Sequence, residues 1–430
     1  MTDSTQPKRP GSGRTVFHYR DYRLLWVARL MSGISAQMQL VAVGWLVYDI
    51  THDPLALGLI GLIAFLPWVA LVLVTGQVAD RYDRRLILVF SYAVSSAVSF
   101  GLFLFALGDP KEVWPIYCFV LVLGITRAFA MPTTSALVPN LVPKEELGHA
   151  IAWSSSAFQV ATIVGPALGG ILYIWGPALV FVISSAGIAL TAIIIYQIRP
   201  RPVRDRPTRM DWANVIAGLV FIRSKPVIFG AVTLDMVAVL LGGAEALLPI
   251  FARDILAIGP LGLGIMRSMP AAGAICMVVL LARHAITSRV GVQMFAAVAI
   301  FGLATIGFGL STNLYFSLGC LFVLGAADMI SVYVRQTLVQ IETPDSMRGR
   351  VAAMNSLFIG TSNQLGEFES GTVARLIGTI PCVVVGGIGT VIVSGLWAKW
   401  FPELRTRDRL IPDAIEELAI SSDTHNQPAR

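Results

Sequence analysis

Long apolar stretches alternate with short charged segments along this chain, and that alternation restricts the fold more than any other feature. A membrane-spanning helix needs about 20 predominantly apolar residues. Spanning strands would show apolar and polar residues in strict alternation over about ten positions, and the continuous apolar runs lack this pattern. Because backbone polar groups must be satisfied inside lipid, the stretches predict an all-α integral membrane protein.

Twelve stretches are long enough to cross a bilayer, which predicts twelve transmembrane helices. They lie at about residues 23–48, 56–79, 86–107, 113–137, 149–173, 178–197, 226–251, 260–282, 290–310, 314–340, 350–377 and 381–401. The composition agrees, since 55% of the residues are hydrophobic and only 13% are charged. A soluble domain carries about 25% charged residues, so a soluble globular protein is excluded.

The distribution of Lys and Arg predicts the topology. If the N-terminus is cytoplasmic, 25 of the 32 basic residues fall in cytoplasmic segments and three on the opposite side, and the other four lie within the spans. This asymmetry follows the positive-inside rule and places both termini in the cytoplasm. The net charge of +6 is thereby explained without a nucleic-acid partner.

The hydrophilic stretch after the sixth span divides the chain into two halves of six helices. The expected organisation is an N-terminal cytoplasmic segment (1–22), a first half (23–197), a cytoplasmic linker (198–225), a second half (226–401) and a cytoplasmic tail (402–430). No apolar segment with a small-residue cleavage site precedes the first span, so we expect that span to direct insertion.

The two halves resemble each other when the chain is laid on itself. An offset of 201 residues pairs Gly165 with Gly366 and Ser155 with Ser356, and the offset is about 204 near the start of each half. Chance similarity between apolar helices is the alternative explanation. A parallel repeat with a substrate site near the midplane is a known transporter plan.

A charged turn between the second and third spans carries the most specific motif. It reads Gly-Gln-Val-Ala-Asp-Arg-Tyr-Asp-Arg-Arg over residues 76–85. This turn, together with the six-plus-six topology, resembles the major facilitator superfamily, whose motif is roughly Gly-x-x-x-Asp-Arg-x-Gly-Arg-Arg/Lys. The matching residues are Gly76, Asp80, Arg81, Arg84 and Arg85, and Asp83 replaces the usual glycine. The resemblance implies a gating latch on the cytoplasmic side, whereas a simple positive-inside anchor is the alternative.

Two further stretches narrow the resemblance. Gly165, Pro166, Gly169 and Gly170 in the fifth span are similar to the antiporter motif of superfamily exporters, with Ala161 where glycine is usual. Residues 127–143 and 365–371 are similar to the branch that contains the enterobactin exporter and macrolide efflux pumps. Small residues also allow helices to pack closely, which is the simpler explanation of the fifth-span motif.

Charged residues inside the spans are the candidate transport site. A charge at a helix centre costs about 2.5–3.5 kcal/mol on insertion scales, so such residues pair or face a wet cavity. The candidates are Arg127, Asp328, Asp235, Glu245, Arg29 and Arg335. Arg127 and Asp328 occupy equivalent positions in the repeat, and Arg335 follows Asp328 by two helical turns.

We expect Asp328, Asp235 or Glu245 to bind protons and Arg127 to tune the acid that it neighbours. A static ion pair between Arg127 and Asp328 is the alternative, and Arg29 is as well explained by contact with headgroups. Two further acids, Glu367 and Glu369, point about 200° apart on their helix and receive no assigned role.

No phosphate-binding loop, HExxH motif or Cys/His cluster is present in the sequence, so we expect no enzyme, no cofactor and no bound metal. The hypothesis is a monomeric secondary transporter in the inner membrane, which exchanges protons for a small amphipathic compound such as a siderophore or drug. An importer or facilitator on the same fold is one alternative. A transporter-like membrane sensor is another.

Overall fold

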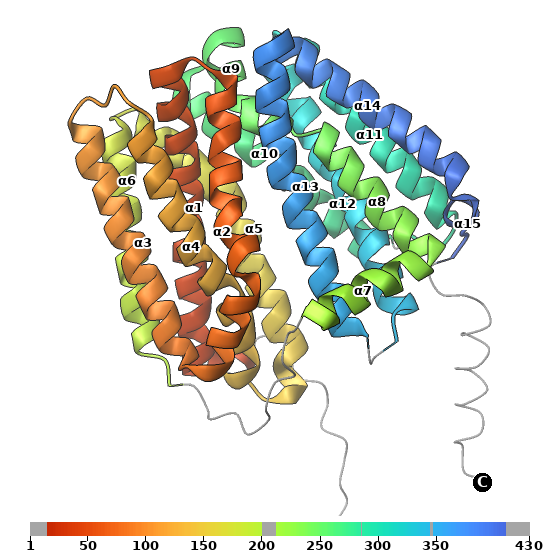
Figure 1. Ribbon diagram of the computed structural model, residues 1–430, viewed down its shortest axis with the longest axis horizontal. Helices are drawn as coiled ribbons and strands as arrows, with labels where there is room; N and C mark the ends of the chain where they lie inside the picture. Colours follow the sequence, from red (N-terminus) through yellow and green to blue (C-terminus); the bar gives the residue numbers. More distant parts are fainter. Residues whose placement is uncertain (1–14, 200–211, 285, 345–346, 410–430) are drawn as a thin grey trace, which may run out of the picture. The chain divides into compact units, whose positions relative to one another are not determined.

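The computed structural model describes residues 15–199, 212–284, 286–344 and 347–409, and within these ranges it contains helices and no strand (Figure 1). Residues 1–14 of the expected N-terminal segment, 200–211 of the linker and 410–430 of the tail lie outside these ranges. In chain order the elements are η1 (Thr15–His18), α1 (Arg20–Thr51), α2 (Pro54–Arg81), α3 (Arg84–Leu107), α4 (Trp114–Leu137), η2 (Val138–Asn140), η3 (Lys144–Glu146), α5 (Leu147–Tyr173), α6 (Pro177–Tyr196), α7 (Trp212–Ser224), α8 (Pro226–Leu241), η4 (Ala244–Leu247), α9 (Leu248–Ile250), the π-helical turn η5 (Phe251–Ile255), α10 (Gly259–Arg283), α11 (Val290–Leu310), α12 (Leu314–Glu342), α13 (Arg348–Ile377), α14 (Thr379–Trp400) and α15 (Pro402–Arg405).

Eleven helical segments in the described part of the chain are long and apolar enough to cross a membrane. α13 has 30 residues and is long enough, but it is markedly more polar than the others. With α13 the structure accounts for twelve transmembrane helices, which confirms the fold class predicted from the sequence.

The chain forms two compact units. Unit 1 contains residues 1–211 and 246–268, and unit 2 contains residues 212–245 and 269–430. The short segment 246–268 therefore follows the linker in the sequence but packs with the first six helices. The chain passes from one unit to the other within η4 and again within α10.

Unit 1 is a bundle built mainly on α1, α3 and α6. α1 packs against α5 and α6, α3 against α4 and α6, and α2 against α4 (Figure 1). One cluster of buried apolar residues lies at the end of this bundle nearest the chain start, and it includes Val16, Tyr22, Leu137 and Ile198.

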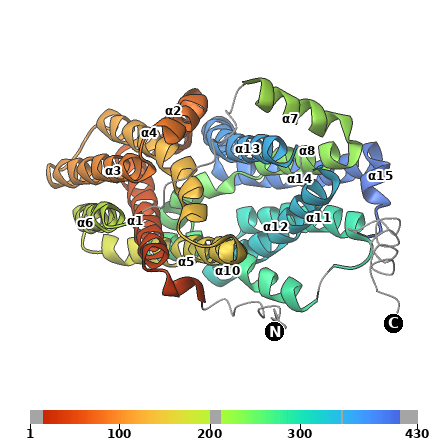
Figure 2. The same cartoon turned by 90° about the horizontal axis from the view of Figure 1, so that it is seen from below.

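Unit 2 is arranged around α8, α11 and α14. α11 packs against α12 and α14, whereas α13 packs against α7, α8 and α14 (Figure 2). Its buried apolar residues form two clusters, one of which joins α8, α11, α12 and α14 and the other α7, α8, α12 and α13.

The seventh span differs from the single helix expected over 226–251. α8 ends at Leu241, and η4, α9 and η5 follow after Gly242 and Gly243. A Cβ atom on Gly243 would lie 2.6 Å from the carbonyl oxygen of Gly366, so the helix break touches the backbone of α13. Two adjacent glycines disfavour a continuous helix and permit this close approach.

Candidate functional site

A buried ion pair joins α8 to α12 in unit 2. Arg335 and Asp235 are only 2% and 6% exposed, and Arg335 Nη2 lies 3.0 Å from Asp235 Oδ2. Arg335 Nη1 also donates a hydrogen bond of 3.2 Å to Asn355 Oδ1 on α13. One guanidinium thus connects three helices, and breaking such a pair leaves an uncompensated buried charge.

Asp328 lies beside this pair. Since Asp328 precedes Arg335 by seven residues on α12, the two side chains leave the helix on nearly the same face. A cavity of about 10 Å³ is lined by Asp235, Asp328 and Ser331 together with apolar residues of α8, α11 and α12. This volume is close to the ~10–15 Å³ that one water molecule requires.

Two polar atoms near the cavity have no hydrogen-bond partner among the described residues. These are Ser331 Oγ and Arg335 Nε, and both are buried. Buried polar groups in native proteins are nearly always hydrogen-bonded to protein or water. A water molecule between the two aspartates and Ser331 would therefore satisfy donors and acceptors that the protein leaves open.

The structure brings together three of the six charged residues that the sequence singled out, namely Asp235, Asp328 and Arg335. Glu245 lies beyond the helix break on η4, where it is exposed. The sequence analysis named Arg127 as the residue that tunes an acid, but within unit 2 it is Arg335 that neighbours Asp328.

The two remaining candidates belong to unit 1. Arg127 lies on α4 and is exposed. Arg29 lies on α1, half-buried, where its charge interacts with the hydroxyl groups of Tyr22 and Tyr92. The transport role expected of Arg29 and its alternative, contact with headgroups, both stay predictions.

The motif between α2 and α3 mostly stabilises helix ends within unit 1. Asp83 caps α3, because its carboxylate accepts a hydrogen bond from the backbone of Arg85 at 2.8 Å. Arg84 donates to the carbonyl of Ala136 in the last turn of α4 at 2.9 Å. Such contacts satisfy carbonyl groups that a helix C-terminus leaves open.

Arg85 makes the equivalent contact at the end of α6. It donates to the carbonyl of Ile198 at 3.3 Å, and its guanidinium lies 5.4 Å from the ring centre of Tyr196. Arg81 is exposed, and Gly76 lies within α2. The side chain of Asp80 is outside the described part of the structure, so the latch expected there stays a prediction.

The glycine motif of α5 lies in a tight three-helix contact within unit 1. A Cβ atom on Gly165 would lie 2.5 Å from Gln37 Cβ, and one on Gly169 would lie 2.9 Å from Met38 Cα, both on α1. On the other side, a Cβ atom on Gly170 would lie 2.6 Å from the carbonyl oxygen of Pro260 at the start of α10. These glycines allow α5 to touch two backbones at once.

Pro166 and a serine complete this contact. The carbonyl of Pro166 lies 2.4 Å from the position of a Cβ on Gly264, and Ser268 Oγ donates to the carbonyl of Ile163 at 2.7 Å. The motif therefore joins α5 to the part of α10 that belongs to unit 1. Close packing is its observed role in this structure.

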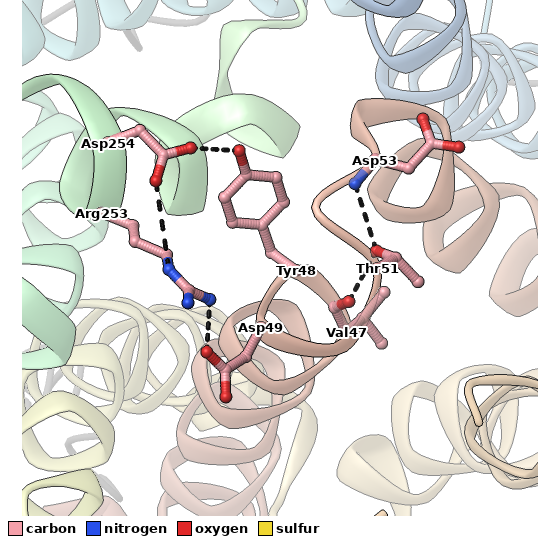
Figure 3. A network of polar contacts seen from close by, with 7 residues as sticks. All are labelled: Val47, Tyr48, Asp49, Thr51, Asp53, Arg253 and Asp254. Atoms are coloured by element: carbon pink, nitrogen blue, oxygen red, sulfur yellow. Dashed lines mark hydrogen bonds and ion pairs between the residues drawn. The ribbon is translucent and has the colours of Figure 1, made fainter. Parts of the chain in front are cut away.

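A polar network that the sequence analysis missed joins the end of α1 to η5 (Figure 3). Arg253 forms an ion pair with Asp49, and Tyr48 donates a hydrogen bond to Asp254. Arg253 also lies over the ring of Tyr48, with 5.9 Å between the guanidinium carbon and the ring centre. Both partners of the ion pair are within unit 1.

The sequence contained a signal for this network. Asp49 and Arg253 are 204 residues apart, which equals the repeat offset near the start of the two halves. Opposite charges at equivalent positions of the repeat marked the two residues as candidates for a pair. Next to it, Asp53 caps α2 by accepting a hydrogen bond from the backbone of Leu55 at 3.0 Å.

Comparison with known proteins identifies the family to which the chain belongs. The family described as transmembrane secretion effector matches residues 12–422. The chain belongs to this family. It is thus a multi-pass membrane transporter of the major facilitator type.

The curated relatives of this family member include siderophore exporters. The enterobactin exporter EntS of Citrobacter koseri is 25% identical over 385 residues, which cover 89% of this chain and 92% of that protein. EntS of Escherichia coli O157:H7 is 24% identical over 396 residues, with coverage of 92% and 94%. The resemblance to the enterobactin exporter branch is confirmed.

Solved structures show the same fold at lower identity. A bacterial homologue of the human lysosomal transporter Spinster, inward-facing and occupied, has a TM-score of 0.70 and 16% identity over 90% of this chain and 98% of that one. A bacterial homologue of the iron transporter ferroportin, also inward-facing, has a TM-score of 0.68 and 16% identity over 89% and 98%. These likenesses establish the fold alone.

Proposed function

We propose that the protein is a proton-coupled exporter of a small amphipathic compound, and that the cluster of Asp235, Asp328 and Arg335 is its coupling site. The observation that carries the proposal is a buried guanidinium shared by three membrane helices, next to a second acid and a water-sized cavity. Ionisable residues within membrane helices commonly mark ion and proton pathways.

The proposed coupling step uses one proton and one guanidinium. When Asp235 accepts a proton, it loses its charge, and the ion pair with Arg335 is no longer favoured. Arg335 then turns toward the carboxylate of Asp328, which lies on the same face of α12. Release of the proton from Asp235 restores its ion pair with Arg335. The position of the Arg335 guanidinium therefore depends on the protonation state of Asp235, and it changes the contacts between α8, α12 and α13.

The helix break at Gly242 and Gly243 supports such a change. It lies two turns beyond Asp235 on α8, and it replaces a rigid helix with a short segment that absorbs changes in backbone angle. Transporter sites in membranes are typically formed by discontinuous helices of this kind. We infer that rearrangement of the ion pair bends the seventh span at this point.

The direction and the cargo are inferred from the relatives. Proteins named enterobactin exporters align over about nine-tenths of the chain, which supports export and a siderophore or a compound of similar amphipathic character, including drugs. The distribution of basic residues supports an inner-membrane location with both termini in the cytoplasm. All residues of the proposed coupling site belong to one unit of one chain, which supports a monomer.

The test measures proton movement in inside-out vesicles that contain the protein. A panel of siderophores, macrolides and other amphipathic compounds is added, and the internal pH is followed for the wild type and for Asp328→Asn and Asp235→Asn. We expect at least one compound to cause proton release from the vesicles, and we expect both substitutions to abolish it. Asp109→Asn, at an exposed loop position with φ of 50° that asparagine tolerates, is the matched control.

Two results would contradict the proposal. Coupled transport that survives in both variants would make the cluster a static ion pair. Compound uptake into right-side-out vesicles without proton movement would instead identify an importer or facilitator on the same fold.

A further inference from the structure

α13 is the most polar of the long helices in the described part of the chain. It has the length of a membrane span, yet it is not among the eleven segments that are apolar enough to be recognised as spans. Its middle third contains Asn363, Gln364 and Glu367, and Glu369 follows two residues later. The polarity of α13 therefore requires an explanation other than contact with lipid.

Three of its polar residues share one face. Ser356, Asn363 and Glu367 are spaced by seven and four residues, so at 100° per residue their side chains leave the helix within about 40° of one another. Ser356 and Asn363 are exposed, and Glu367 is partly buried. We call these three residues the polar face of α13.

The opposite side of the helix has a different character. Leu365, about 180° away from Ser356, is 38% exposed. Phe358 lies close to the same direction and is partly buried. Large apolar side chains on this side are suited to contact with lipid. α13 therefore has one apolar side and, opposite to it, one side that can form hydrogen bonds.

The polar face is deep in the membrane. Asn363 follows Arg348 by 15 residues and precedes Ile377 by 14, which places it about 22 Å and 21 Å from the two helix ends. The hydrocarbon core of a bilayer is about 30 Å thick, so Asn363 is near its centre. An exposed amide at this depth must border water or a polar ligand.

The polar face is next to the proposed coupling site. Asn355, one residue before Ser356 and about 100° around the helix, accepts the hydrogen bond from Arg335. One side of α13 therefore contacts the buried guanidinium, while Ser356 and Asn363 on the adjacent side are exposed. A ligand on the polar face would be one residue away from a partner of Arg335.

The repeat gives an independent indication. The offset of 201 residues pairs Ser356 with Ser155 and Asn363 with Thr162, both of which are on α5 in unit 1. Ser155 is exposed and Thr162 is partly buried. Hydrogen-bonding side chains thus recur at two of the three positions in the same register of the equivalent helix, and Pro166 occupies the position equivalent to Glu367.

We propose that the polar face of α13 is a substrate-binding surface of the water-filled transport path. The amide oxygen of Asn363 and the carboxylate of Glu367 accept hydrogen bonds, so the surface binds the hydroxyl, phenol or ammonium groups of the cargo. The inference rests on the proposed transport of an amphipathic compound, and it is independent of proton coupling.

Thiol labelling tests whether the polar face of α13 is accessible to water. In a background where Cys118, Cys276 and Cys320 are replaced and buried Cys382 is retained, single cysteines are introduced as Asn363→Cys and, on the opposite side at nearly equal depth, Leu365→Cys. The reagent is a membrane-impermeant methanethiosulfonate that carries a sulfonate, added to both sides of the membrane. We expect Asn363→Cys to react at least about tenfold faster, because the reactive thiolate forms in water.

Equal labelling rates at the two positions would overturn the proposal, and so would disulfide-linked dimers formed by Asn363→Cys in native membranes, since these would identify an interface between copies of the chain. The result needs no cargo, and it is the same whether or not transport is coupled to protons. Failure of the proposed function therefore leaves this test intact.

A second measurement tests the ligand chemistry. Export of a polyphenolic compound is compared with export of its methyl ether, which lacks the donating hydroxyl groups. Sites that hydrogen-bond a hydroxyl group reject analogues without it. For wild type and Leu365→Ala, we expect the half-saturating concentration of the free phenol to be lower than that of the methyl ether by about tenfold or more. We expect Asn363→Leu to lose most of this preference, and an unchanged preference in that variant would refute contact between the face and the cargo.

Discussion

Replacement of Arg335 by methionine tests whether the ion pair of unit 2 is a buried, compensated pair. Methionine has a similar length and no charge, so the substitution leaves Asp235, only 6% exposed, without its guanidinium partner. Removal of one partner from a buried pair costs about 3–5 kcal/mol. In a unit of about 200 residues each kcal/mol lowers Tm by about 2–4 °C, so we expect a decrease of about 6–20 °C.

The assay is thermal unfolding of the purified protein in detergent, followed by the amount of monodisperse protein that remains after heating. The double variant Asp235→Leu/Arg335→Met removes both charges, and apolar replacement of a buried pair is often neutral or stabilising. We therefore expect the double variant to recover most of the lost Tm. Arg81→Met, at an exposed position, is the matched control and should change stability by less than about 0.5 kcal/mol.

The reasoning fails if Arg335→Met unfolds at the same temperature as the wild type, because the guanidinium would then compensate no buried charge. It also fails if the double variant is no more stable than the single variant. The same double variant should be inactive in proton-coupled export even though it is folded, which separates the structural contribution of the pair from its proposed function.

Three other substitutions test separate features. Gly170→Val should greatly reduce the yield of folded protein, since a Cβ there would lie 2.6 Å from a backbone carbonyl, whereas Gly395→Ala, with open space around it, should be tolerated in the same expression test. Asp83→Ala removes the cap of α3 and should cost about 1 kcal/mol in thermal unfolding, and no change would show that the cap is dispensable. Asp49→Arg should reduce transport, and Asp49→Arg/Arg253→Asp should restore part of it if the ion pair itself matters, while failure of the exchange would assign the effect to one residue alone.

The sequence was sufficient to predict the fold class because the hydropathy of each stretch and the placement of its flanking charges can be determined directly from the sequence. α13 was predicted as one of the twelve apolar stretches, at 350–377, although Asn363 and Glu367 help to make it the most polar of the long helices in the described part of the chain. The break after Leu241 was missed, although two adjacent glycines follow it. A long apolar window hides a local interruption, because the average over the window remains high.

The side-chain partners were harder to predict. Apolar residues surround most of these helices, so periodicity does not determine which face turns inward, and the repeat register suggested Arg127 as the partner of Asp328. Within unit 2 the structure pairs Asp235 with Arg335, which are 100 residues apart on α8 and α12. The expected pair of Arg127 with Asp328 would join two different units and stays a prediction.

Segment 246–268 has a consequence for how the protein is made. When the chain has been synthesised to residue 211, all six spans of the first half exist, but the backbone that contacts Gly170 and the serine that donates to Ile163 do not. The ion pair of Asp49 likewise cannot form until Arg253 has been synthesised. All residues of the first bundle are therefore present only when the chain has been synthesised to about residue 268, which lies beyond the seventh span and within the eighth. The two halves are synthesised one after the other, but the first cannot fold completely without residues 246–268. A chain cut in the linker would therefore produce an N-terminal fragment that lacks the contacts made by this segment.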